Sequence, residues 1–192
     1  MLRYGDYTFE TVELKGHTFG QLGLFDKENK IFFCADQVID GIVPIVTTTY
    51  PDEHLLKGYF ASMERFRHEF SDCLLFPAHG KHITDPKRVV GRIVFSYLDK
   101  MEIVHNILEH SRRPKTIREI ASIAYGMPQL PKDTDEFIKL KMVMSKCFSC
   151  LEYLRDEDFA VREEKNGTFT GDHKCKNKSK SSSENRSENR RK

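Results

Sequence analysis

Four short apolar segments and one amphipathic segment follow one another in the first half of the chain, and their order constrains the fold most. Residues 7–14 alternate between apolar and polar side chains, which predicts a strand with one buried face. Apolar runs at 21–25 and 30–34 are separated by a turn-rich linker and predict a hairpin. A helix is predicted within 51–68 and a short buried strand at 73–77. This order indicates a mixed α/β (α+β) chain.

The second half of the sequence predicts a different arrangement. A long amphipathic helix should begin at Asp85, which can cap it, and should end before Pro114. Thr116 can cap a short helix, and a longer helix is predicted over about 134–154. Residues 159–170 contain an Asn-Gly pair between two β-prone pieces, which predicts a hairpin. Helix, turn, helix and β-hairpin is the element order of a winged helix.

These changes along the chain divide it into four regions. We expect a first domain at 1–85, a connecting helix at 86–112, a winged-helix-like domain at 113–170 and a tail at 171–192. The tail carries eight Lys or Arg against three Asp or Glu and has too few apolar residues to order itself, so we expect it to be disordered. The rest of the chain has 23 basic and 26 acidic residues, so only the tail has the basic footprint of a nucleic-acid binder.

The sequence also bears on the compartment. The chain opens without a basic segment followed by an apolar run, and no stretch approaches the roughly 20 apolar residues that cross a bilayer. Five cysteines, an odd number, fit a reducing compartment better than a disulfide framework. We therefore expect a cytoplasmic protein with no membrane partner.

Three residues that can bind a metal each lie just after a predicted strand. They sit among small or turn-forming residues: His17 in GHTFG, Asp36 in CAD and His79 in PAHG. Imidazole nitrogens and a carboxylate are ligands that suit zinc and related divalent ions. Residues aimed from strand ends are held rigidly, as a metal or catalytic site requires. The three residues are therefore the candidate metal ligands.

This arrangement resembles the later metal motifs of the metallo-β-lactamase-fold hydrolase superfamily, especially the subgroup with a C-terminal winged helix that is similar to the lactamase-β-2-like endoribonucleases. The resemblance covers roughly residues 5–170. It implies that His17 is the third histidine of the first metal site, that Asp36 bridges two metals and that His79 is the histidine of the second site. It also implies a zinc or other divalent-metal hydrolase of esters, thioesters or RNA phosphodiesters.

The sequence departs from the family pattern in its ligand count. The family's His-x-His-x-Asp-His signature is absent, and Ala35 stands where the family often has glycine. Each metal would keep two protein ligands, whereas catalytic zinc normally has three and a water. The resemblance implies the C-terminal half of an αββα sandwich, and thus a gene fragment, a split gene or a misplaced start. A missing N-terminal half or a second copy of the chain is the expected partner, and an uncovered sheet face should make the isolated chain associate.

A second hypothesis is a non-catalytic remnant that acts as a nucleic-acid or protein binding module through the winged helix and the basic tail. Its candidate nucleic-acid residues are Lys139, Lys141 and Lys146 on the predicted long helix, although acidic residues on that helix offset them. The tail could add weak, salt-sensitive affinity for nucleic acid.

Two further groups of metal-binding type favour ordinary structural interpretations. Cys147 and Cys150 share one face of the long helix, and buried packing is favoured over metal or redox work because no second pair exists. His82 is expected to be a solvent-facing loop residue.

Overall fold

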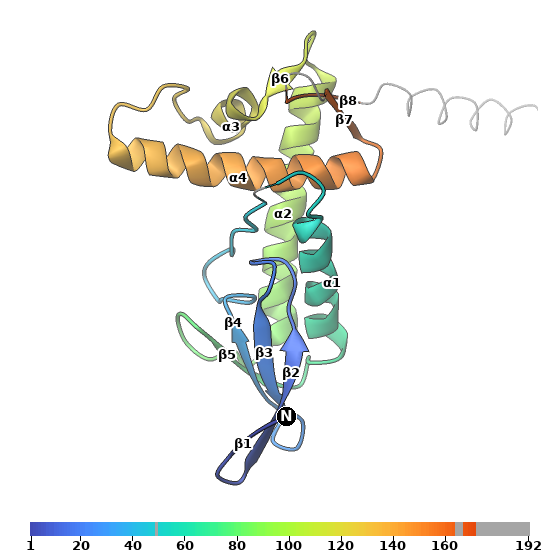
Figure 1. Cartoon of the computed structure of the whole chain (residues 1–192), viewed down its shortest axis with the longest axis vertical. Coiled ribbons are helices and arrows are strands. Elements are labelled where there is room, and N and C mark those ends of the chain that lie inside the picture. The colour runs from blue at the N-terminus through green and yellow to red at the C-terminus, as the bar shows by residue number, and fades with distance from the viewer. Residues whose placement is uncertain (49, 164–166, 172–192) are drawn as a thin grey trace, which may run out of the picture.

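The computed structural model describes residues 1–48, 50–163 and 167–171, and one long helix joins its two parts (Figure 1). The first part is a five-stranded sheet with the order β1-β2-β3-β4-β5. Its strands are β1 (Leu2–Tyr4), β2 (Tyr7–Glu13), β3 (Leu22–Asp26), β4 (Ile31–Ala35) and β5 (Leu74–Pro77). Neighbouring strands from β1 to β4 are antiparallel, and β5 pairs with β4 in parallel. The four predicted strands are confirmed, and β1 was not predicted.

Two helices cover one face of this sheet, α1 (Leu55–His68) and α2 (Pro86–Glu109). The Asp85 side chain caps α2 by accepting a hydrogen bond from the backbone N–H of Arg88 at 3.1 Å, as the sequence predicts. The apolar stripe of α1 lies against the sheet, where the rings of Phe66 and Phe32 are 5.2 Å apart. Burying large aromatic side chains such as these contributes to the free energy that holds α1 on the sheet.

The second part contains a three-stranded sheet and two helices. Its elements are β6 (Lys115–Thr116), α3 (Ile117–Tyr125), α4 (Thr134–Asp156), β7 (Ala160–Glu163) and β8 (Thr168–Gly171), and the sheet order is β6-β8-β7. The predicted order of short helix, long helix and hairpin is confirmed, and Thr116 and Glu119 form a capping box at α3. Gly171, which was assigned to the tail, belongs to β8 instead because it pairs with Ala160. Residues 172–192, the rest of the expected tail, lie outside the described residues.

The two parts share one hydrophobic core. A single cluster of buried residues extends from Leu14 in the first part to Phe169 in β8. Helix α4 runs across α2 (Figure 1), and the segment 44–48 is held between these two helices. The Tyr97 hydroxyl of α2 donates to the Pro44 carbonyl at 2.7 Å and accepts from the backbone N–H of Val46 at 3.0 Å. The second part therefore packs directly on the loops that follow the sheet.

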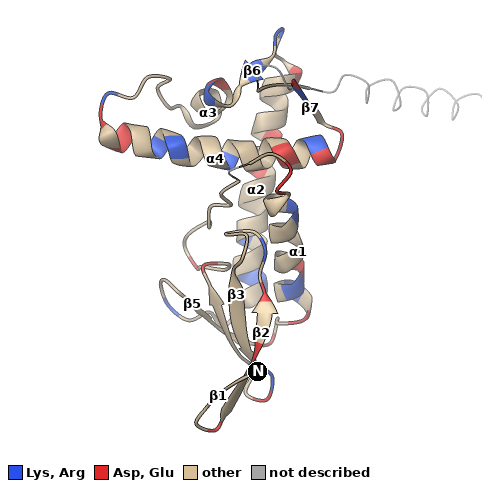
Figure 2. Ribbon diagram, in the orientation of Figure 1, with Lys and Arg blue, Asp and Glu red and all other residues tan. Residues whose placement is uncertain are grey.

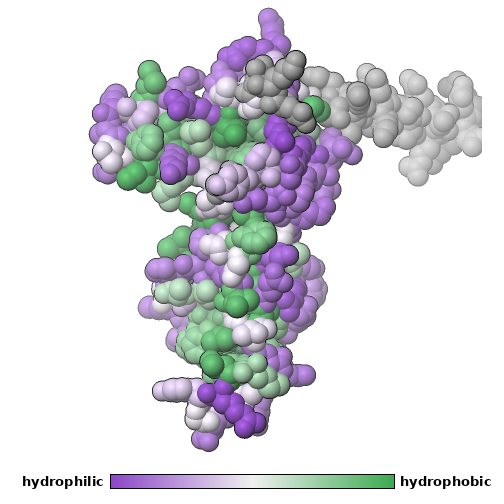
Figure 3. All heavy atoms as spheres, viewed as in Figure 1, coloured by the Kyte–Doolittle hydropathy of each residue, from purple (hydrophilic) through white to green (hydrophobic). Residues whose placement is uncertain are grey.

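The other face of the sheet carries aromatic side chains that none of the described helices covers. Tyr7, Phe9, Phe33 and Phe76 form a chain of ring contacts with centroids 5.2 to 6.2 Å apart. The Phe33 side chain is 43% exposed, and Figure 3 shows apolar residues at the surface of this part of the molecule. No helix in the described part of the chain is long and apolar enough to span a bilayer.

Candidate metal centre

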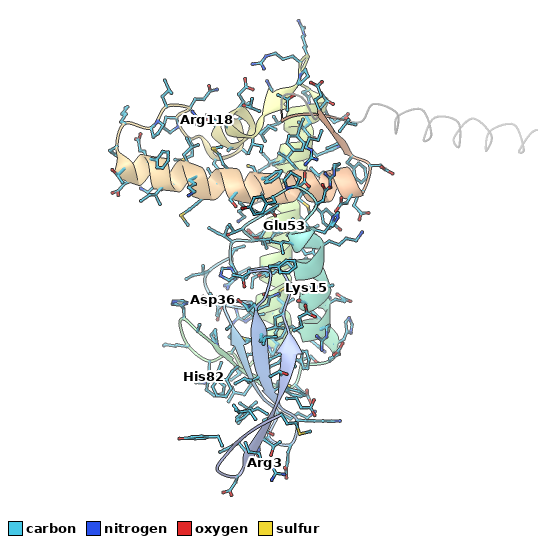
Figure 4. The ribbon with its side chains drawn as sticks, viewed as in Figure 1. Arg3, Lys15, Asp36, Glu53, His82 and Arg118 are labelled. Atoms are coloured by element: carbon cyan, nitrogen blue, oxygen red, sulfur yellow. The ribbon has the colours of Figure 1, made fainter. Side chains whose placement is uncertain are left out.

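Three strands of the first sheet end at the same edge. Because β2 and β4 are each antiparallel to β3, and β5 is parallel to β4, the strands β2, β4 and β5 run in one direction. The loops after these strands carry His17, Asp36 and His79. Figure 4 labels Asp36 and Lys15 at this edge, on the side of the sheet nearest α4, with Arg3 at the opposite end.

The structure brings Asp36 and His79 into direct contact. The Nδ1 atom of His79 lies 2.6 Å from Oδ1 of Asp36, and because a carboxylate accepts, Nδ1 carries the proton. The parallel pairing continues past the two strands, since the backbone N–H of Ala78 donates to the Ala35 carbonyl at 3.1 Å. The His79 side chain is 69% exposed and that of Asp36 is 25% exposed. The Nε2 atom of His79 therefore remains available as a ligand.

Ala35 adopts a left-handed backbone conformation immediately before Asp36. Its φ is 48°, and the pairing register between β4 and β5 shifts between Phe33 and Ala35. This conformation costs a residue with a Cβ roughly 1 to 2 kcal/mol, which explains why glycine suits the position. The turn ends β4 and begins the loop that carries Asp36.

His17 lies at the same edge but does not join the pair of Asp36 and His79 by any direct contact among the described residues. Its Nδ1 atom is 2.8 Å from the carbonyl oxygen of Ile45, so Nδ1 donates and Nε2 is left with its lone pair. Metal-binding histidines commonly fix their orientation through such a bond to a carbonyl. The ring also forms part of the wall of a hollow beside α4.

Gly16 fixes the path of the chain into His17. Its φ is +137°, and a Cβ at this position would lie 2.4 Å from Cβ of Tyr59 in α1. Only glycine allows the loop to approach the helix this closely. The loop that carries His17 is therefore seated directly on α1.

Gln37 connects the loops of the site, and sequence reasoning missed it. Its side chain is fully buried, and its amide donates to the Lys15 carbonyl at 2.8 Å. Its Oε1 atom accepts from the Gln21 side chain at 2.9 Å and, at 3.4 Å, from the backbone N–H of His17. The hydroxyl of Tyr59 donates to the Gln37 carbonyl at 2.9 Å. Its position directly after Asp36 was the only signal in the sequence.

The residues that the structure describes do not by themselves form a metal site. No group of three or more His, Cys, Asp or Glu side chains in the described ranges is arranged to hold a metal ion. Catalytic zinc takes three protein ligands and a water, and here two of the three candidate residues are in contact. The donor chemistry suits a divalent metal, whereas the number of converging ligands does not.

The candidate nucleic-acid residues differ in their surroundings. Lys139 and Lys141 are exposed, whereas Lys146 is half-buried, with its ammonium 4.9 Å from the centroid of the Tyr97 ring. Figure 2 shows basic and acidic residues along α4, without one continuous basic face in that view.

The cysteines of α4 and the remaining histidine of the β5 loop are placed as expected. Cys147 and Cys150 are both buried, and desolvation raises the pKa of each thiol to about 12, so neither is a reactive thiolate near neutral pH. His82 is exposed, with its ring 6.1 Å from that of Phe76.

Two hollows adjoin the site along α4. The larger, of about 520 Å³, lies between His17, Thr47 and Ser145. The smaller, of about 290 Å³, includes Tyr125 and Lys146 in its wall. Pockets of this size accommodate small organic ligands.

Solved structures share this architecture. A metallo-beta-lactamase family protein from Thermus thermophilus superposes with a TM-score of 0.73 at 18% identity, over 88% of this chain and 51% of that one. A beta-lactamase domain protein from Burkholderia ambifaria superposes with a TM-score of 0.76 at 19% identity, over 88% of this chain and 50% of that one. This chain has the metallo-β-lactamase fold. It spans about half the length of the structures it matches.

Sequence similarity gives no evidence of family membership. No protein-family model and no curated protein matches the sequence. The metallo-β-lactamase fold therefore rests on the structural likeness and on the order of its elements.

Proposed function

We propose that this chain contributes part of a metal-dependent hydrolase site, with His17, Asp36 and His79 as its ligands for zinc or a related divalent ion. The remaining ligands come from another polypeptide segment, and the chain alone binds metal weakly and does not turn over substrate. The substrate class is an ester, a thioester or an RNA phosphodiester. The region 113–170 is a winged-helix module packed beside this site, and the protein works in the cytoplasm.

The observation that carries the proposal is the meeting of three strand ends at one edge of a sheet with the metallo-β-lactamase fold. Asp36 and His79 are already in contact at 2.6 Å, and His17 keeps Nε2 free because Nδ1 bonds to the Ile45 carbonyl. Gln37 holds the loop of His17 to the loop of Asp36. Such supporting bonds are what a site needs to keep its ligands oriented before the metal arrives.

The partner is proposed to cover the aromatic face of the first sheet. Tyr7, Phe9 and Phe33 form a connected apolar surface on the face opposite α1 and α2. Exposed apolar patches of this kind commonly mark protein–protein contacts. A segment that carries the first sheet of the sandwich, or a second copy of the chain, would bury it.

Histidine imidazole spectra recorded during a zinc titration of the purified chain test the ligand assignment. We expect the resonances of His17 and His79 to shift at millimolar zinc, because two or three ligands bind zinc weakly. Asp36→Ala should abolish the shift of His79. The matched control Asp72→Ala removes a carboxylate that pairs with Lys30 near the start of β5, and should leave the shift unchanged.

Two outcomes would contradict the proposal. Equal shifts at all histidines, unaffected by Asp36→Ala, would show that the strand ends are not a metal site. Stoichiometric tight zinc together with turnover of a model phosphodiester by the isolated chain would refute the need for further ligands.

A non-catalytic binding module is the second candidate function. The observation in its favour is that the described residues do not gather three metal ligands. Retention of RNA that falls with salt and disappears on deletion of residues 172–192 would support this candidate. Indifference to RNA and DNA at low salt would remove it.

A further inference from the structure

The two hollows beside α4 are neighbours that share part of their walls. Ile45 and Met142 line both of them, so one apolar surface separates the hollow that contains His17 from the hollow that contains Lys146. The walls of both are mainly apolar. We call the two together the α4 groove.

The α4 groove has a rigid wall. The hydroxyl of Ser149 in α4 donates to the Val46 carbonyl at 2.8 Å and is 2.7 Å from the Thr48 hydroxyl. Tyr97 of α2 holds Pro44 and Val46 from the other side. A segment fixed at both ends in this way is preformed for a ligand, so binding does not have to order it.

Lys146 is an unusual cation at the end of the groove away from His17. It is half-buried, and its ammonium lies over the Tyr97 ring at 4.9 Å without an ion pair to any carboxylate of the described residues. Desolvation lowers its pKa, and the charge of Lys100 lowers it further. A partly buried ammonium without a counter-ion is costly, and a bound anion would offset that cost.

Two other lysines lie at or near the same hollow. The ammonium of Lys100 lies 4.6 Å from the centroid of the Tyr125 ring, which forms part of the wall. Lys139 also lines the hollow, about two helical turns before Lys146 on α4, and is exposed. Lys146 and Lys139 thus line one small, mainly apolar space, and Lys100 contacts a residue of its wall.

We propose that the α4 groove binds an amphipathic monocarboxylate, with the carboxylate beside Lys146 and Lys139 and the apolar stem over Ile45 and Met142 toward His17. A single charge on an apolar stem matches the groove better than a polyanion does. The wall that receives the stem is mainly apolar in area, although Lys141 also borders it, and a second or third charge would have to be desolvated against that wall. This site stands whether or not the strand ends bind metal.

Calorimetric titration of the full chain with octanoate tests the proposal, with hexanoate, octanol and acetate as companion ligands. We expect octanoate to bind about tenfold more tightly than hexanoate, because each buried methylene contributes a factor of about three to four. Octanol, which lacks the charge, and acetate, which lacks the stem, should both bind at least tenfold more weakly than octanoate.

Lys146→Met keeps an apolar stem on the Tyr97 ring and removes the charge, so it should weaken octanoate at least tenfold while the thermal midpoint stays the same or rises. Lys132→Met is the matched control, because Lys132 is exposed and does not line either hollow. It should leave the affinity unchanged. Asp36→Ala should also leave octanoate binding unchanged, which separates this site from the proposed metal site.

Three results would overturn the proposal. Octanoate binding that Lys146→Met does not alter would place the ligand elsewhere. Equal affinity for octanol and octanoate would show a hydrophobic hollow without an anion site. Binding of a single-stranded RNA that Lys146→Met abolishes, without any octanoate binding, would assign the lysines to nucleic acid instead.

Discussion

Gln37→Leu should destabilise the protein by about 2 kcal/mol. The Gln37 side chain makes two short hydrogen bonds, at 2.8 Å to the Lys15 carbonyl and at 2.9 Å to the Gln21 amide. Each is worth about 1 kcal/mol net, whereas the 3.4 Å contact with His17 is too long to add much. Leucine has a similar volume, so the cavity contribution is small.

The loss of stability in Gln37→Leu is limited because the former hydrogen-bond partners of Gln37 can find other partners. The Lys15 carbonyl still accepts from the Ser62 hydroxyl at 3.0 Å. The Gln21 side chain is only partly buried and can turn to water. The full penalty for an orphaned buried group, about 1 to 3 kcal/mol for each group, is therefore avoided.

Urea denaturation followed by circular dichroism measures this difference. Gln21→Leu is the matched control, because it removes only one of the two short bonds and should cost less than about 1 kcal/mol. If Gln37→Leu lowered the free energy of unfolding by less than about 0.5 kcal/mol, Gln37 would not be the residue that joins the loops. An equal decrease for Gln37→Leu and Gln21→Leu would refute that role as well.

Three further predictions follow from single contacts. Gly16→Ala should lower the free energy of unfolding by roughly 3 kcal/mol, because residue 16 has a positive φ and the new Cβ would clash with the backbone of α1. Gly20→Ala has open space around its Cβ and should change stability by less than about 0.5 kcal/mol. The pKa of Glu119 is lowered to about 2, first by the hydrogen bond from the Arg113 guanidinium and then by the capping box with Thr116. The stability from this pair is therefore present above the ordinary value of 4.5 and is lost as the pH falls toward 2, and Glu119→Gln should remove that dependence. Phe33→Glu should reduce the self-association of the isolated chain, whereas Phe95→Glu, on exposed α2 surface, should not.

Each of these predictions has a direct measurement. Urea midpoints compare the two glycine variants, and equal losses would contradict the close approach at α1. Amide-exchange rates of α3 between pH 5 and 2, in the wild type and Glu119→Gln, test the pH dependence. Sedimentation velocity tests the aromatic face, and a wild-type chain that stays monomeric at all concentrations would contradict the association.

Much of the fold was predictable because it depends on local patterns. The strands β2 to β5 and the helices α1, α2 and α4 follow from apolar periodicity, and Thr116 marks the start of α3 by its side chain alone. Strand β1 was missed because its three residues are all exposed and give no alternation. Its place depends on pairing with β2, which a local pattern does not reveal.

The candidate site was only partly predictable. The order of His17, Asp36 and His79 after three strands could be read from the sequence, because strand direction decides which ends meet. The burial of Gln37 and the left-handed turn at Ala35 could not, since both depend on contacts with α1 and on the pairing of β4 with β5. The segment 44–48 has no regular secondary structure, so its role as a wall of the α4 groove emerged only from the packing.

Anomalous diffraction from a crystal of this chain soaked in zinc would examine the strand-end site most directly. We expect a partly occupied zinc peak within bonding distance of the Asp36 carboxylate and the His79 ring, with the hydrogen bond between these two groups broken so that both face the ion, and with the His17 ring at the same edge of the sheet. Zinc peaks only at other histidines, such as His54 or His110, or an electron-density map with the three side chains far apart, would contradict the account.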